Sequence, residues 1–145
     1  MKKTESSWPL LLTAQAVLTE EVERRLDAAG LPSLAWYDVL WALERAPERR
    51  LRMHELADGM VLSRSNLTRL VDRLGEAGLL RRETDPADRR GAFAVLEPKG
   101  EELRRRMWPV YAAAIRELYD AHLDAEEQKV LGAALRKLIA AARAQ

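Results

Sequence analysis

Residues 62–82 read Leu62-Ser-Arg-Ser-Asn-Leu-Thr-Arg-Leu-Val-Asp-Arg-Leu-Gly-Glu-Ala-Gly-Leu-Leu-Arg-Arg82, and they carry the clearest structural pattern in the chain. Apolar residues recur there at three- and four-residue spacing, which predicts an amphipathic helix from Ser63 to Gly78. Ser63 is a good N-cap, and Gly78 is a good residue to follow a helix. The face predicted to point inward consists of Leu67, Leu70, Val71, Leu74 and Ala77.

The outward faces of this helix carry arginines and small polar side chains near its N-terminal end. They are Arg64, Ser65, Asn66, Thr68, Arg69 and Arg73. Such a helix end suits the DNA major groove, because Arg can fork onto guanine, Asn can pair with adenine, and hydroxyls can reach phosphates or bases. The same residues also fit the solvated face of an ordinary surface helix, so the helix alone leaves both interpretations open.

Hydrophobic periodicity and helix breakers divide the rest of the chain. Further helices are predicted over about 6–30, 34–46, 53–59 and 124–142, a long helix is predicted to open at Glu97-Pro98, and two short strands are predicted over 79–83 and 92–96. The predicted order is α-α-α-α-β-β-α-α, a mainly α (α+β) fold in a single domain of 145 residues. Asp124 and Glu127 match a capping box, and Pro109 is predicted to interrupt or kink its helix.

A basic hairpin follows the Ser63 helix, with its predicted tip from Thr84 to Gly91. Asp85-Pro86 suits a turn, and an arginine at a protruding tip can enter a narrow minor groove. A neighbouring carboxylate can hold that guanidinium in place. An ordinary charged turn would explain Asp85-Pro86 but not four arginines on one hairpin. The helix pair and the hairpin therefore predict a winged helix-turn-helix that binds DNA. The four arginines are Arg81, Arg82, Arg89 and Arg90.

Charge and composition agree with this interpretation. The net charge is +1, but residues 45–106 hold 15 basic and 11 acidic residues, and the remainder holds 9 basic and 12 acidic. The middle of the chain is thus where a nucleic acid would bind. The absence of cysteine excludes disulfides, thiolate zinc sites, cysteine nucleophiles and thiol-based redox sensing. No apolar run reaches the roughly 18 residues of a membrane span, and the start lacks a convincing signal peptide, so a cytoplasmic protein is expected.

An enzyme is not expected. The segment His54-Glu-Leu-Ala-Asp58 nearly spells the zinc-protease motif HExxH, but the only other histidine is His122 and no third ligand is apparent. The same segment doubles as the first helix of the helix-turn-helix. The sequence shows neither a His-carboxylate-nucleophile set nor a Gly-rich phosphate loop, so we expect no metal and no cofactor.

Several motifs together resemble the MarR family of winged helix-turn-helix transcriptional regulators, over essentially the whole chain. The motifs are Leu51-Arg-Met-His-Glu-Leu-Ala57, Leu62 to Leu74, Ala77-Gly-Leu-Leu-Arg-Arg82, Asp85-Pro-Ala-Asp-Arg-Arg90 and Leu96-Glu-Pro-Lys-Gly100.

The resemblance implies roles for individual residues. It implies that the Ser63–Ala77 helix enters the major groove, that Arg90 probes the minor groove, and that Asp88 supports Arg90. The expected DNA-binding residues are Ser63, Arg64, Ser65, Asn66, Thr68, Arg69, Arg73, Asp88, Arg89 and Arg90.

Three positions depart from the commonest pattern of that family. Arg52 stands where a capping Ser or Thr is frequent, and Glu97-Pro98 replaces the usual Leu-Thr cap of the next helix. Gly75 replaces a better helix former, a loss of about 1 kcal/mol in a helix interior. These positions affect capping and rigidity rather than the residues expected to face the grooves.

The outer helices, about 6–30 and 101–145, have apolar stripes too wide for the winged lobe at about 34–100 to cover. An intramolecular bundle could bury these stripes, but we favour a homodimer whose N- and C-terminal helices intertwine, as in MarR-family proteins. Two recognition helices would then read half-sites about 10–10.5 bp apart in a pseudo-palindromic operator.

Aromatic residues gather in the helices near the predicted joint between the dimer and DNA-binding parts. Members of the MarR family often bind anionic aromatic ligands such as phenolic acids there. The residues suggested for such an effector pocket are Trp36, Tyr37, Met53, His54 and Trp108, whereas Trp41 is expected in the core. The expected function is that of a sequence-specific transcriptional regulator, a ligand-responsive repressor that binds double-stranded DNA as a homodimer. The alternative is a winged-helix module for protein–protein contact without DNA binding.

Overall fold

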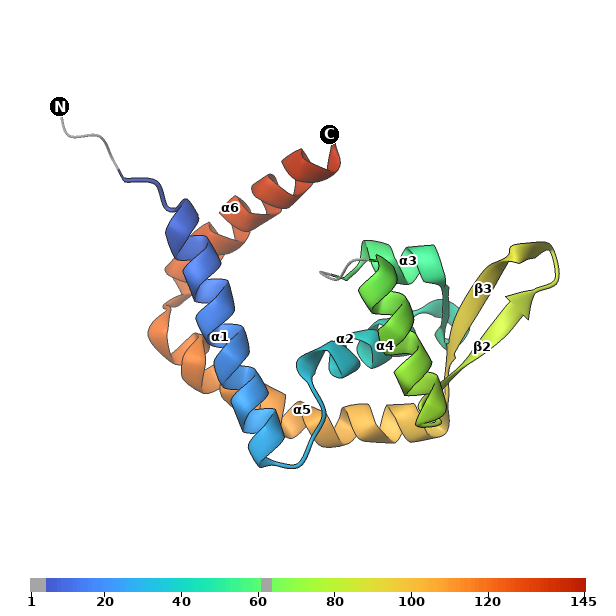
Figure 1. Cartoon of the computed structure of the whole chain (residues 1–145). Coiled ribbons are helices and arrows are strands. Elements are labelled where there is room, and N and C mark those ends of the chain that lie inside the picture. The colour runs from blue at the N-terminus through green and yellow to red at the C-terminus, as the bar shows by residue number, and fades with distance from the viewer. Residues whose placement is uncertain (1–4, 61–63) are drawn as a thin grey trace. The chain divides into compact units, whose positions relative to one another are not determined.

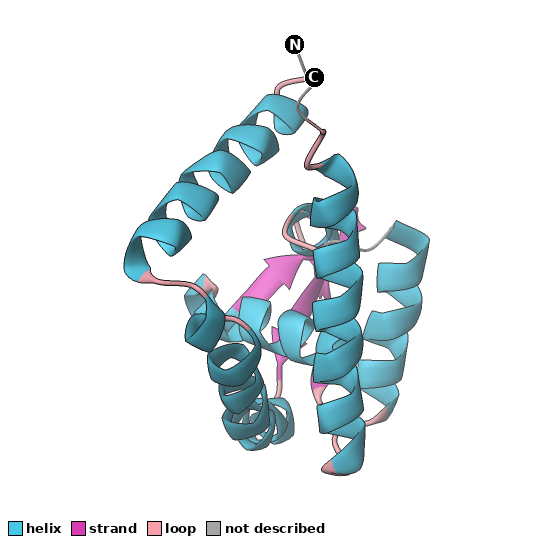
Figure 2. Cartoon of the chain, turned by 90° about the vertical axis from the view of Figure 1, so that its left-hand side faces the viewer, coloured by secondary structure: helices cyan, strands magenta, loops and turns pink. Residues whose placement is uncertain are grey.

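The computed structural model describes residues 5–60 and 64–145, and only the backbone of Arg64, Arg89 and Arg90 (Figure 1). Helices predominate, and the strands gather in one place (Figure 2). The elements are α1 (Trp8–Ala28), α2 (Leu34–Arg45), the 3-10 turn η1 (Pro47–Arg49), β1 (Arg50–Arg52), α3 (Met53–Asp58), α4 (Arg64–Glu76), β2 (Leu80–Asp85), β3 (Asp88–Leu96), α5 (Pro98–Leu118), the 3-10 turn η2 (Asp120–His122) and α6 (Ala125–Arg143). The predicted order of helices and hairpin strands is confirmed.

The chain divides into two compact units, residues 1–111 and residues 112–145. The first unit contains the helix-turn-helix (α3 and α4), the hairpin (β2 and β3) and the helices α1 and α2. The second contains the whole of α6 and the C-terminal end of α5. No helix in the described part of the chain is both long enough and apolar enough to cross a membrane.

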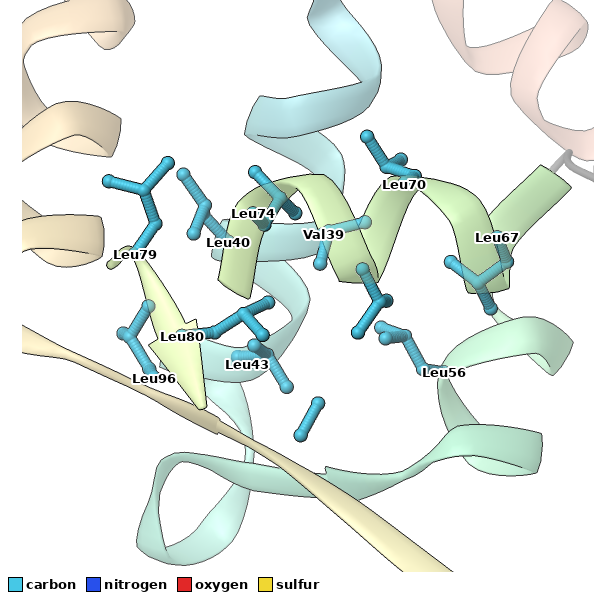
Figure 3. Close-up of a cluster of buried hydrophobic side chains, with 12 residues drawn as sticks. Val39, Leu40, Leu43, Leu56, Leu67, Leu70, Leu74, Leu79, Leu80 and Leu96 are labelled. Atoms are coloured by element: carbon cyan, nitrogen blue, oxygen red, sulfur yellow. The ribbon is translucent and has the colours of Figure 1, made fainter. Parts of the chain in front are cut away.

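The core of the first unit is a cluster of aliphatic side chains contributed by α2, α3, α4, the strands and the α4–β2 connection (Figure 3). α4 contributes Leu67, Leu70, Val71 and Leu74, all buried, so the predicted inward face is confirmed for these four. The buried face of α4 anchors that helix, so its opposite face is directed outward. The other members are Val39, Leu40, Leu43, Leu56, Leu79, Leu80, Ala94 and Leu96.

The sheet has three antiparallel strands in the order β1-β3-β2. Leu80 pairs with Leu96 at the base of the β2–β3 hairpin, and the ladder continues to Asp85 and Asp88 beside the turn. β1 pairs Arg50 with Val95 and Arg52 with Phe93. The sequence analysis did not predict β1, because three residues carry no periodic pattern and their partner strand lies about forty residues further on.

Two glycines explain how the hairpin is attached to its neighbouring helices. Gly78 follows α4 at φ 77°, and the Leu79 N–H then donates to the Leu74 carbonyl at 3.0 Å, which ends the helix as predicted. Gly100 lies in the first turn of α5, where a Cβ would stand 2.1 Å from the Leu79 carbonyl oxygen. The start of α5 therefore packs against the α4–β2 connection at a distance that only glycine permits.

α5 runs from Pro98 to Leu118 and includes Pro109, so this proline does not interrupt the helix, and the alternative of a kink stays a prediction. A proline in a helix removes one main-chain hydrogen bond and crowds the preceding turn, at a cost of about 3 kcal/mol. In a helix of 21 residues the other hydrogen bonds hold the backbone helical on both sides of it. Pro98, by contrast, stands in the first turn, where its missing N–H costs nothing.

α6 begins with the predicted capping box. The Glu127 N–H donates to the Asp124 carboxylate at 2.8 Å, and the Asp124 N–H donates to the Glu127 carboxylate at 3.1 Å. No residue of α6 is buried, and its apolar residues Val130, Leu138 and Ile139 are each half exposed or more.

Candidate nucleic-acid interface

α4 presents a polar surface beside the hairpin. Ser65, Asn66, Thr68, Arg69 and Arg73 are all exposed, while Leu67, Leu70 and Val71 between them are buried in the core. The 3.6-residue period of the helix produces this separation, since the buried leucines occupy only one side. The structure thus brings these five predicted residues together on one helix. Arg64 is the first residue of α4, and Ser63 lies outside the described residues.

The hairpin projects beyond α4 as a two-stranded wing (Figure 1). Its turn is tighter than predicted, because β2 reaches Asp85 and β3 begins at Asp88, leaving only Pro86 and Ala87 between them. The predicted tip from Thr84 to Gly91 is therefore mostly strand, and Arg89 and Arg90 belong to β3 by their backbone. Asp88 is exposed at the first position of that strand.

Asp85 explains the tight turn. Its Oδ1 accepts the Ala87 N–H at 2.9 Å, a local turn in which the side chain replaces a main-chain acceptor. Asp85 is also the only polar residue buried among the side chains that the structure describes. The hydrogen bond from Ala87 and the nearby Arg52 guanidinium lower the pKa of this carboxyl. Because the turn closes in two residues, the strand pairing extends almost to the tip.

Two of the four hairpin arginines are paired within the chain. Arg81 Nη1 lies 2.9 Å from a Glu97 carboxylate oxygen, and Arg82 Nη2 lies 2.9 Å from one of Asp72. These pairs tie the wing base to the start of α5 and to α4. The count of four arginines therefore overstates the positive charge that the hairpin offers to a polyanion.

The sequence analysis assigned no role to Arg50, Arg52 or Phe93, which the structure places together beside the middle of the wing. The guanidinium carbons of Arg50 and Arg52 lie 4.4 Å and 4.7 Å from the centre of the Phe93 ring. Arg50 also pairs with Glu83 at 2.6 Å. The departure from the family pattern at Arg52 is the one sequence signal that pointed to this cluster.

The five residues suggested for an effector pocket lie in three places within the first unit. Tyr37 and Trp108 stack, with ring centres 6.0 Å apart, and Tyr111 packs edge-on against both. Burial raises the pKa of Tyr37 and of Tyr111. This cluster joins α2 to α5.

Met53 and His54 lie apart from this cluster and line a cavity of about 250 Å³ between α3, α4 and the wing. Its other lining residues are Arg52, Ala57, Leu67, Thr68, Gly91 and Ala92. Trp36 lines a second cavity of about 340 Å³, with Lys99 and Arg106 of α5 among its neighbours. Within one chain the five residues do not form a single pocket.

Trp41 is not a core residue, contrary to the sequence-based prediction. Its side chain is 37% exposed, and the guanidinium carbons of Arg104 and Arg45 lie 5.0 Å and 5.8 Å from its ring centre. Arg104 also pairs with Glu44 at 2.9 Å. Val39, Leu40 and Leu43 occupy the buried side of α2, which leaves Trp41 at its edge, where cations stack on it.

The His54–Asp58 segment forms α3. Glu55, which the zinc-protease motif would use as a base, instead accepts the Arg52 N–H at 2.9 Å and so caps this helix. Among the residues described, no three His, Cys, Asp or Glu side chains are grouped so as to hold a metal ion.

Comparison with known proteins identifies this arrangement. The MarR family profile matches residues 29–91. YkoM of Bacillus subtilis (strain 168), an uncharacterized HTH-type transcriptional regulator, is 31% identical over 93 residues, which are 64% of this chain and 58% of that protein. The transcriptional repressor MprA of Escherichia coli (strain K12) is 28% identical over 130 residues, which are 90% of this chain and 73% of that protein.

Two solved structures from Streptomyces coelicolor share the whole fold. The MarR family regulator AbsC superposes with a TM-score of 0.88 at 31% identity, covering 100% of both chains. The MarR family regulator Sco3205, solved in complex with DNA, superposes with a TM-score of 0.86 at 33% identity, covering 96% of this chain and 90% of that one. With its helix-turn-helix, its wing and this similarity over full length, the chain belongs to the MarR family of DNA-binding transcriptional regulators, which are not enzymes.

Proposed function

We propose that this chain binds a pseudo-palindromic double-stranded DNA operator as a homodimer and represses transcription by occupying a promoter. The observation that carries the proposal is the exposed polar face of α4 beside a projecting two-stranded wing. MprA, a relative across most of this chain, is a transcriptional repressor, which supports repression rather than activation. A regulator that acts on DNA in this way is expected in the cytoplasm.

The proposed contacts follow the two DNA grooves. We assign the N-terminal end of α4 to the major groove and the wing to the minor groove. We retain the predicted residues for these roles, with Asp88 as the support of Arg90. On α4 they are Ser63, Arg64, Ser65, Asn66, Thr68, Arg69 and Arg73, and on the wing Asp88, Arg89 and Arg90.

The proposed dimer accounts for apolar side chains that lie exposed on the outer helices. On α1, Trp8 is 63% exposed and Leu10 is 71% exposed. On α6, Val130 is 59% exposed. Exposed apolar rows on two long helices are typical of a surface that a second copy covers, because a monomer rarely leaves such a patch in water. A two-fold dimer also supplies the second recognition helix that a palindrome requires.

We further propose that a small aromatic or phenolic effector regulates DNA binding. Two of the candidate places combine apolar walls with a cation suited to an acid group: the cavity at Met53 and His54, beside Arg52, and the cavity at Trp36, beside Lys99. The cluster of Tyr37 and Trp108 is the third. An effector can act only if it binds the DNA-competent and DNA-incompetent states with different affinity.

The proposed function is tested by selecting bound sites from random duplex DNA and then titrating salt against the selected site. Affinity should fall steeply as salt rises, because lysine and arginine contacts to phosphates release counterions. The protein-contact alternative predicts a flat response or no binding. Repeating the selection with candidate aromatic acids tests the effector, which should weaken binding to the selected operator.

Replacing Arg90 with alanine should weaken operator binding by about 1–3 kcal/mol and leave the dimer intact. The expected reason is loss of an arginine from the minor groove, where the negative potential is concentrated. Fluorescence anisotropy measures the affinity, and sedimentation measures the dimer. A variant that binds DNA normally but dissociates into monomers would contradict the assignment of the wing.

Replacing Asn66 or Arg69 with alanine should change which base is preferred within a half-site. Both side chains are exposed on α4, where they can reach base edges in the major groove. Selection from random duplexes with each variant reads this preference directly. If every sequence is instead weakened equally, these residues contact only phosphates.

A further inference from the structure

Arg52 lies where the helix-turn-helix meets the wing, and it contacts both. Its main chain ends β1 and precedes α3, and its N–H donates to the Glu55 carboxylate at 2.9 Å. Its guanidinium Nη2 lies 2.5 Å from Oδ2 of Asp85, the last residue of β2. A single residue therefore links the first turn of α3 to the turn of the wing.

The position of Asp85 depends on this ion pair. The Asp85 side chain is only 7% exposed, and its other oxygen accepts the Ala87 N–H that closes the wing turn. A carboxylate buried to this extent is costly when its paired cation is removed, because only the more distant charge of Arg50 then compensates it. Loss of the Arg52 guanidinium would push Asp85 toward water, and the turn that Asp85 closes would move with it.

Arg52 is also held from two other sides. Its guanidinium carbon lies 4.7 Å from the ring centre of Phe93, its direct partner in the β1–β3 ladder. A Cβ on Gly91 would stand 2.9 Å from Nη1 of Arg52, so the absence of a side chain at Gly91 leaves room for the guanidinium. Stacking, strand pairing and the ion pair together give the arginine one orientation.

We propose that Arg52 is a positioning residue that sets the angle of the wing, and hence how its tip enters the minor groove. This inference rests on the proposed function. The β1–β3 ladder fastens the hairpin to β1 only as far as Phe93, whereas the Arg52–Asp85 contact fastens it at the turn. At position 52, where a short capping residue is frequent in the family, this chain has an arginine long enough to reach Asp85 of the wing.

A double-mutant cycle on the selected operator tests the proposal, with Arg52→Gln, Asp85→Asn and the double variant. Each single variant should lose about tenfold in affinity, and the double variant should lose no more than either, since both remove the same contact. Preference for the base pairs beneath the wing should weaken, while preference beneath α4 should persist. Arg45→Gln is the matched control, because Arg45 also stacks on an aromatic ring, that of Trp41, but belongs to α2. This variant should bind the operator as the wild type does.

Hydrogen exchange without DNA provides the second readout. In Arg52→Gln the Ala87 amide and its hairpin neighbours should exchange faster, while the amides of α2 and α4 stay unchanged, which a general loss of stability would not produce. Arg52→Lys keeps the charge and should recover part of the affinity. If Arg52→Gln does not fold, Arg52→Lys and Asp85→Asn supply the same cycle.

Additive losses in the cycle, or unchanged hairpin exchange, would overturn the proposal, because Arg52 would then act on DNA by itself or not at all. If the wild-type protein binds no duplex, the proposed function fails, and the exchange experiment still decides whether Arg52 holds the wing.

Discussion

Gly100→Ala is expected to destabilise the protein by about 3 kcal/mol or more, at the upper end of the range for overpacked sites. The added Cβ would stand 2.1 Å from the Leu79 carbonyl oxygen and 3.0 Å from its carbon, well inside van der Waals contact. Backbone atoms cannot swing aside as a side-chain end can. The Leu79 carbonyl also accepts the Glu97 N–H at 3.1 Å, so moving it would disturb the start of α5.

Gly75→Ala is the matched control, and it should raise the stability that Gly100→Ala lowers. A Cβ there meets nothing closer than a Leu80 methyl at 3.9 Å, and Gly75 lies inside α4. Alanine should therefore stabilise the helix by about 1 kcal/mol. Thermal unfolding followed by circular dichroism, at one protomer concentration, should lower the Tm of Gly100→Ala by about 10 °C and raise that of Gly75→Ala. An unchanged Tm for Gly100→Ala would show that α5 and Leu79 do not approach so closely.

Replacing Leu138 and Ile139 together with glutamate is expected to convert the proposed dimer into a monomer and to abolish tight operator binding. Both side chains are about half exposed in the single chain, at 54% and 50%, so their loss leaves little to disturb within it. Two unpaired carboxylates could not be buried in an apolar dimer interface. A monomer has only one DNA-binding lobe, so it loses the affinity gained by binding two linked half-sites, roughly 10²–10⁴-fold.

Sedimentation velocity and anisotropy with the selected operator measure the two effects. Glutamate is a good helix former, so the far-ultraviolet circular dichroism of α6 should persist. Lys137→Glu, on the same exposed helix, changes charge without removing apolar area and should remain dimeric. A double variant that remains dimeric and binds DNA normally would mean that the two copies meet through another surface.

Local signals in the sequence were sufficient to predict most of the helices and strands. The inward face of α4, the glycine that ends it and the capping box of α6 all depend on residues within a few positions of one another. Such interactions form wherever the segment lies, so a pattern of spacing predicts them. The same reasoning placed Ser65, Asn66 and Arg69 on one outward surface, which the structure confirms.

Contacts between distant segments escaped the sequence analysis. β1 exists because Arg50 to Arg52 pair with β3, and Trp41 is exposed because other residues of α2 fill the core. The arginine count of the hairpin gave no sign that Arg81 and Arg82 pair within the chain.

By itself the sequence determined the family, the order of the elements and the polar face of α4, because each depends on short-range patterns. Only the tertiary structure decided that Arg52 meets Asp85, that Gly100 must lack a side chain and that the suggested pocket residues lie in three places. These facts depend on which distant side chains come within a few ångströms of one another, and no local pattern encodes that distance.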